Sequence, residues 1–145
     1  MDNTELNYAI FTANIDKVNR ILNKGVNPNR LDQFRRTSLH YAAIFATKNS
    51  NILLSLIDHG ANLNIKDIEG NTPLMYLLNV PFDTIAFTRI YGRYKIELKD
   101  KECASSSVKL LLNSGANPNI CNRMGEFPTH LALSSFDREI LNLLG

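Results

Sequence analysis

Histidine and cysteine are the residues of this sequence best suited to binding a metal or attacking a substrate, and there are few of them. The 145 residues include three histidines, His40, His59 and His130, and two cysteines, Cys103 and Cys121. A structural zinc site needs about four such ligands, and no zinc-type spacing occurs. Phosphate-binding glycine loops, nucleophile elbows, zinc-protease motifs and EF-hand loops are also absent from the sequence. The sequence therefore predicts no catalytic residue, no metal site and no cofactor.

The spacing of the histidines favours a structural role. His40 and His130 stand at the same place in two similar segments, TSLHYAA and FPTHLAL, so we expect each to form a hydrogen bond at the start of a helix. His59 precedes a glycine and would favour the C-terminal end of a helix. Neither Cys103 nor Cys121 has a neighbouring base that would activate its thiol.

The segment Gly60–Leu74, GANLNIKDIEGNTPL, would end one helix and begin the next. Gly60 follows an apolar run and has the features of a C-cap, because glycine enters the left-handed region without a Cβ penalty. The asparagine, aspartate and glycine residues after it are turn formers. Thr72 and Pro73 then fit an N-cap followed by the first helical residue.

The same motif, which ends one helix and begins the next, occurs three times at fixed spacing. The motifs GVNPN, GANLN and GANPN begin at Gly25, Gly60 and Gly115, and a helix-start position follows each glycine after twelve residues. The rest of the unit takes 21 residues in the first copy, 23 in the second and 43 in the third. The basic period is therefore 33 residues, and the third copy carries 22 extra residues. A fixed period of this length indicates a repeat architecture.

This period and these motifs resemble the ankyrin repeat. The first-helix segments TELNYAI, TSLHYAA, TPLMYLL and FPTHLAL carry the resemblance, together with the second-helix segments VNRILNKG, ILLSLIDHG and VKLLLNSG. The resemblance implies an all-α solenoid of stacked antiparallel helix pairs joined by short β-hairpin loops. We expect a single domain, 1–145, with repeats at about 4–30, 31–65, 66–120 and 121–145 and an insertion at about 80–101.

The insertion is rich in aromatic residues and in charges of both signs. Asp83 could cap a short helix over Thr84–Tyr91, whereas the apolar residues between Ile90 and Leu98 could instead form part of a strand. An insertion with several large apolar residues is not typical of a flexible linker. We expect it to fold back on the solenoid or to contact a partner.

The fourth repeat stops before its second helix would be complete. Ile140, Leu141 and Leu144 would then have no following repeat to cover them. Terminal repeats normally carry a polar outer face. The chain is therefore either a fragment of a longer protein or a protein with a short natural terminus, and this end could serve self-association or partner binding.

Composition excludes several other classes of protein. The hydrophobic fraction of 44% is sufficient for a core, and a net charge of +2 gives no general attraction to nucleic acid. No apolar run approaches the ~20 residues needed to span a membrane, and the N-terminus lacks the features of a signal peptide. Two cysteines without a disulfide pattern favour a reducing compartment, so we expect the cytoplasm or the nucleus.

The resemblance implies that partners meet the hairpin tips and the inner face of the first helices. In the tip over 32–36 the family normally has glycine where Arg35 stands, so this residue either adopts a positive φ or changes the turn. Several carried-over positions are apolar where exposure is expected, which is typical of an interaction surface unless the insertion covers it. The partner-binding candidates at the tips are Gln33, Phe34, Arg36, Ile68, Glu69, Asn71, Arg123, Met124 and Glu126, and those on the inner helices are Phe11, Thr12, Ile44, Phe45, Asn79, Val80, Ser134 and Ser135.

These observations predict a non-catalytic module that binds another protein through its tips and concave inner-helix face. One alternative is a targeting or substrate-recruiting domain of a larger protein; another is a viral or pathogen-encoded ankyrin-type mimic of a host inhibitor. A third is nucleic-acid binding through Arg89, Arg93 and Lys95, which alternate with Tyr91 and Tyr94 in the insertion. Nearby acidic residues dilute this cluster, so a mixed, solvated surface is favoured and nucleic acid is not the expected partner.

Overall fold

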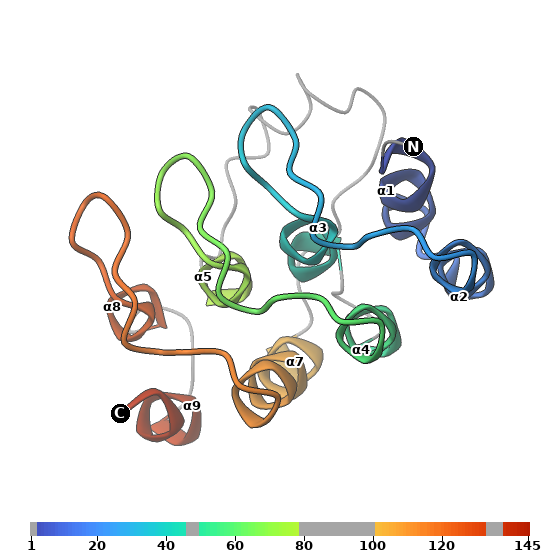
Figure 1. The fold of residues 1–145 in the computed structure, drawn as a ribbon. Coiled ribbons are helices and arrows are strands. Elements are labelled where there is room, and N and C mark those ends of the chain that lie inside the picture. Colours follow the sequence, from blue (N-terminus) through green and yellow to red (C-terminus); the bar gives the residue numbers. More distant parts are fainter. Residues whose placement is uncertain (1–2, 46–49, 79–100, 133–137) are drawn as a thin grey trace.

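The helices of this protein stack in two parallel rows. The structure is a computed structural model that describes residues 3–45, 50–78, 101–132 and 138–145. Within these ranges it has eight helices and no strand, and the helices of each row lie side by side (Figure 1). The first row contains α1 (Thr4–Phe11), α3 (Ser38–Phe45), α5 (Pro73–Leu78) and α8 (Pro128–Ala132), and the second contains α2 (Ile15–Asn23), α4 (Asn51–Asp58), α7 (Lys101–Asn113) and α9 (Arg138–Leu144).

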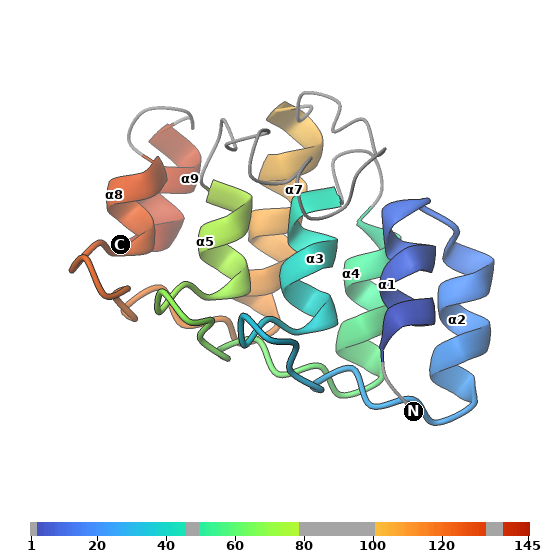
Figure 2. The ribbon, with the colours of Figure 1, turned by 90° about the horizontal axis from the view of Figure 1, so that it is seen from above.

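Stacking of neighbouring pairs buries the apolar faces of the helices. Each first-row helix contacts its own second-row partner and the next first-row helix, as α1 does with α2 and α3. The core is continuous along the stack because each pair covers the face that its neighbour leaves open. Seen from above, the N-terminus and the C-terminus lie at opposite ends of the array (Figure 2). This is the all-α solenoid that the resemblance to the ankyrin repeat implies.

The glycine-asparagine motifs end the second-row helices and tie successive repeats together. Gly60 has φ +84°, and the N–H of Ala61 reaches back to the carbonyl of Leu56 over 2.9 Å, which closes α4. Asn29 of the preceding repeat donates to the Gly60 carbonyl over 2.8 Å and accepts from the N–H of Asn62 over 2.7 Å. The asparagines of the motif therefore act between repeats as well as within turns.

Three loops project from one side of the stack, each leading into a first-row helix (Figure 1). In the first, the N–H of Asp32 donates to the carbonyl of Arg36 over 3.0 Å, which gives the loop the shape of a hairpin. Each loop has one such bond, too few for a strand to be assigned within the described residues. Arg35 adopts φ +58°, so a non-glycine residue keeps the same turn that Gly70 and Gly125 make. Of the two expectations for Arg35, the positive φ is the one observed.

The last helix corrects one expectation. Ile140 and Leu144 are buried, because α9 packs against α7 and α8 and turns these residues inward. Leu141 is half-buried, and the exposed apolar residue of α9 is Leu143, of whose surface 47% is accessible. Most of the insertion over 80–101 lies outside the described residues, as do Asn79 and Val80 and the serines at 134 and 135. No described helix is both long enough and apolar enough to cross a membrane.

Candidate protein-interaction surface

One side chain at the start of each projecting loop fixes the shape of the tip. Asp32 Oδ1 accepts hydrogen bonds from the backbone N–H groups of Phe34 at 2.8 Å and Arg36 at 2.9 Å. Asp67 and Asn122 hold the second and third tips in the same way. A short side chain with an acceptor oxygen can bond the backbone two residues ahead, which is why aspartate and asparagine suit this position. The three tips consequently share one backbone shape.

The first two tips are also anchored to the helices below them. The hydroxyl of Tyr41 donates to the second carboxylate oxygen of Asp32, and the hydroxyl of Tyr76 donates to that of Asp67. The third tip has Leu131 at the equivalent position, which has no hydroxyl to offer. This anchor was missed at the sequence level, although an aspartate followed nine residues later by tyrosine occurs in both repeats.

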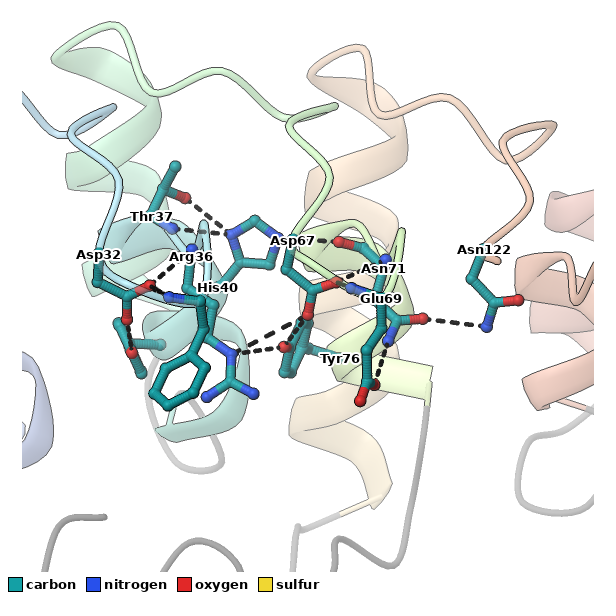
Figure 3. Close-up of polar contacts among 11 residues, drawn as sticks. Asp32, Arg36, Thr37, His40, Asp67, Glu69, Asn71, Tyr76 and Asn122 are labelled. Carbon is teal, nitrogen blue, oxygen red and sulfur yellow. Dashed lines mark hydrogen bonds and ion pairs between the residues drawn. The ribbon is translucent and has the colours of Figure 1, made fainter. Parts of the chain in front are cut away.

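Arg36 bridges the second and third repeats (Figure 3). Its Nε donates to the Tyr76 hydroxyl over 2.9 Å and lies 4.0 Å from the Asp67 carboxylate. The guanidinium carbon is 4.9 Å from the centre of the Phe34 ring, a cation–π arrangement. Burial lowers the pKa of Arg36, but the two tyrosines beside it outweigh burial, so its pKa is raised and the charge is retained. Burial and the bond to Asp67 raise the pKa of Tyr76.

His40 and His130 hydrogen-bond at the start of their helices, as predicted. Nδ1 of His40 accepts from the N–H of Thr37 over 3.0 Å, and Nε2 lies 3.0 Å from the Asn71 carbonyl, which assigns the proton to Nε2. Nδ1 of His130 accepts from the N–H of Phe127 over 3.0 Å. The His40 ring is fully buried, and this burial lowers its pKa. These contacts assign both residues to the scaffold rather than to a site.

Backbone hydrogen bonds join the three tips into one row. The N–H of Ile68 in the second tip donates to the carbonyl of Phe34 in the first over 3.0 Å. The N–H of Arg123 in the third tip donates to the carbonyl of Glu69 in the second over 2.9 Å. The tips therefore present their outer side chains at fixed relative positions.

The predicted tip residues differ in how far they reach the surface. Met124 has 82% of its surface exposed and Ile68 has 43%, so two apolar side chains stand in solvent on adjacent tips. Phe34 is only half-buried, with Arg36 beside its ring. Of the remaining candidates, Gln33, Glu69 and Arg123 are exposed, and Arg36, Asn71 and Glu126 are half-buried.

The inner-helix candidates are less accessible than expected. Ile44 is completely buried, so the expectation that it contributes to an exposed binding face is wrong. The reason is that α3 lies inside the stack and packs against α1, α4 and α5. Phe11 and Phe45 are half-buried, with ring centres 4.8 Å apart, and they form the accessible aromatic part of this face.

A groove of about 460 Å³ opens between the second and third tips. Ile68, Glu69, Met124 and Glu126 line it, together with Leu131 of α8. Two exposed apolar residues and two carboxylates from neighbouring repeats thus meet in one concave site. The sequence predicted the four tip residues but not Leu131, whose signal was the missing tyrosine nine residues after the tip begins.

The described residues contain no group of three or more histidine, cysteine, aspartate or glutamate side chains that could hold a metal ion. Cys121 is a half-buried free thiol. His59 bonds the Ser55 carbonyl over 2.8 Å at the end of α4, the C-terminal position expected for it. The basic and aromatic residues between 89 and 95, on which nucleic-acid binding was considered, lie outside the described residues.

Family models and individual relatives both identify the chain as similar to ankyrin-repeat proteins. The sequence model of ankyrin repeats in many copies matches residues 21–77, and that of the single ankyrin repeat matches residues 69–123. The chain is 29% identical to FPV230, an ankyrin repeat protein of fowlpox virus, over 88% of its own length and 73% of that protein. The chain is 35% identical to a second fowlpox virus ankyrin repeat protein, FPV024, over 68% of the chain's own length.

An intracellular phospholipase A2 of Caenorhabditis elegans is 38% identical to the chain over 64% of the chain's length. The chain spans 7% of the length of that phospholipase and 13% of FPV024. Similarity to such small parts of longer proteins concerns the repeats alone. With the 33-residue period, the paired helices and the two matching repeat models, the chain belongs to the ankyrin-repeat family.

Proposed function

We propose that this chain is a non-catalytic module that binds a protein partner through its hairpin tips and the adjoining inner-helix face. Ankyrin repeats generally mediate protein–protein interaction, and the finer assignment rests on one observation. The tips are joined by backbone hydrogen bonds and hold Ile68 and Met124 exposed beside the charged side chains of Glu69 and Arg123. A preformed surface loses little conformational entropy on binding, so exposed apolar groups on it contribute efficiently to affinity.

The test compares two apolar residues of equal exposure. Ile68 has 43% of its surface exposed on the second tip, and Leu54 has 42% exposed on α4. Ile68→Asp and Met124→Asp should each weaken a purified partner's binding at least tenfold, while Leu54→Asp should leave the affinity unchanged. Circular dichroism would first establish that all three variants are folded. Equal affinity for the tip variants and the parent chain would refute the proposed surface.

A second candidate is a recruiting domain within a longer protein. The observation that favours it is the small fraction of the phospholipase and of FPV024 that the chain spans. An ankyrin-type mimic encoded by a virus is the variant of this candidate that the two fowlpox virus relatives favour. In each case the binding surface is the same, and we place its action in the cytoplasm or the nucleus because the two cysteines have no disulfide pattern.

A further inference from the structure

We propose that the groove between the second and third tips receives an arginine side chain of the protein partner. This inference rests on the proposed function, because it names what one part of the tip surface recognises. Between the first and second tips, the chain's own Arg36 occupies the corresponding place.

Arg36 supplies the internal template. It stands four residues after Asp32 in the first tip and extends to the next repeat, where it meets Tyr76 and Asp67. Its side chain has only 18% of its surface exposed, and its guanidinium lies against the ring of Phe34. The space between the first and second tips is therefore filled by a guanidinium that bonds an oxygen of the following repeat (Figure 3).

The corresponding positions one repeat later hold smaller side chains. Asn71 takes the place of Arg36, Asn122 that of Asp67, and Leu131 that of Tyr76. The two amides reproduce the contact between repeats, since Nδ2 of Asn122 donates to Oδ1 of Asn71 over 3.1 Å. Neither they nor the leucine fill the volume of an arginine and a tyrosine, and the groove of about 460 Å³ lies at this place.

The charges around the groove complement a cation. Glu69 and Glu126 line it, and their only described side-chain partners are neutral amides. Oε2 of Glu126 accepts from Asn122 over 2.9 Å, and Oε2 of Glu69 lies 3.5 Å from Nδ2 of Asn71. Arg123 also borders the groove, yet among the described residues it forms no ion pair with either glutamate. Both carboxylates are thus available to an incoming cation.

The shape and apolar character of the groove favour arginine over lysine. A planar guanidinium has five donors and can bond two acceptors at once, whereas an ammonium is a compact, strongly hydrated point charge. Met124, Ile68 and Leu131 offer apolar surface for the methylene stem that carries the charge. Arg36 shows a similar combination between the first and second tips, where its Nε is hydrogen-bonded and its guanidinium lies against the Phe34 ring.

The experiment selects peptide ligands without assuming a partner. A phage-displayed library of random twelve-residue peptides is panned against the full chain, and the affinities of the selected peptides are measured by calorimetry. The arms are the parent chain, the Glu69→Gln/Glu126→Gln variant, and Asp16→Asn/Asp58→Asn as a control with the same change in charge at exposed positions. Each peptide is also synthesised with citrulline or lysine in place of its arginine.

We expect the tip-binding peptides to share an arginine whose replacement by citrulline lowers affinity at least tenfold, with lysine intermediate. The glutamine variant should bind the arginine and citrulline peptides equally, and the control should match the parent. Asn71→Arg should weaken binding of the arginine peptides without unfolding the chain. The new arginine would occupy the groove as Arg36 occupies the space between the first and second tips.

Three results would overturn the inference. Peptides that lose affinity with Met124→Asp but show no arginine requirement leave the tip surface standing and refute the arginine site. Selected peptides that bind Met124→Asp and Ile68→Asp as tightly as the parent refute the proposed function and this inference together. A selection that yields no peptide dependent on Glu69 and Glu126 also counts against the arginine site.

Discussion

Arg36 of the first tip and Tyr76 of the third repeat are joined across the stack by a hydrogen bond of 2.9 Å from Nε to the phenolic oxygen. The same phenol donates to Asp67, so one oxygen connects a cation of one repeat to the tip carboxylate of the next. The three groups form a polar link between repeats, in addition to the backbone hydrogen bonds between tips and the contacts of Asn29 with the following repeat.

Loss of the bridge should weaken coupling between repeats. Arg36→Met keeps an unbranched apolar stem but removes the guanidinium with its donors and charge, so we expect the free energy of unfolding to fall by about 1–3 kcal/mol. Urea denaturation measures the loss, and Arg20→Met at an exposed position is the control. In a double-mutant cycle with Tyr76→Phe the two losses should be less than additive. Strict additivity would show that the two side chains contribute independently.

His40 should make the protein sensitive to acid. Burial holds the pKa of His40 below its ordinary value in the folded state. The hydrogen bond with the Asn71 carbonyl and the nearby carboxylates raise this pKa by smaller amounts, and the charge of Arg36 lowers it. The unfolded chain therefore binds a proton more readily, and this contribution to stability is complete above about pH 6.5 and falls as the pH drops below it.

The pH test compares slopes rather than absolute stabilities. His40→Gln should show a smaller decrease in unfolding free energy between about pH 7 and pH 5 than the parent chain, measured by urea titration at each pH. The same substitution at exposed His130 controls for the change of a histidine to glutamine. A parent chain and His40→Gln variant with the same slope would contradict this account.

Replacement of Gly70 by alanine should destabilise the protein more than the same replacement of Gly60. Gly70 has φ +82°, and a Cβ added to it would lie 2.9 Å from the backbone nitrogen of Arg123 in the next tip. Gly60 has nearly the same φ of +84° but nothing within 4 Å of such a Cβ. Gly60→Ala should therefore cost about 1–2 kcal/mol from backbone strain alone. Gly70→Ala should cost more and disturb the bond between tips; equal thermal shifts for the two variants would refute this.

Arg35→Gly should stabilise the protein. Arg35 holds φ +58°, which costs a residue with a Cβ about 1–2 kcal/mol, whereas glycine adopts this conformation freely and loses only about 0.5–1 kcal/mol through greater unfolded-state entropy. The net gain expected therefore lies between about 0 and about 1.5 kcal/mol. The measurement is the urea midpoint, and a lower midpoint for Arg35→Gly would mean that the arginine side chain makes a contact worth more than the strain.

A charge introduced at Ile44 should lower the free energy of unfolding far more than a charge introduced at Met124. Ile44 is fully buried in α3, so Ile44→Asp places an unpaired carboxylate in the core and should unfold the chain or cost several kcal/mol. Met124 is 82% exposed, and Met124→Asp should change unfolding free energy by no more than about 0.5 kcal/mol. Thermal melting by circular dichroism distinguishes the two, and a folded Ile44→Asp variant of parental stability would place Ile44 at the surface.

Much of the architecture followed from local sequence signals. The motif that begins at Gly60 specifies a helix end and a turn by backbone chemistry alone, and its recurrence at a fixed period indicated a repeat architecture. The resemblance to the ankyrin repeat then implied the stack of helix pairs. The roles of His40 and His130 also followed, because a hydrogen bond from the start of a helix involves residues only three positions apart. Such local interactions depend on spacing that can be read along the chain.

Contacts between repeats depended on the tertiary structure. Ile44 occupies a position that the resemblance assigns to an exposed face, but the packing of α3 against three neighbouring helices buries it. The sequence identified Ile68, Glu69, Met124 and Glu126 one by one as tip residues, whereas their meeting in one groove depends on how two repeats stack. Burial and cavity shape arise from side chains that are distant in sequence, and only the folded chain brings those side chains together.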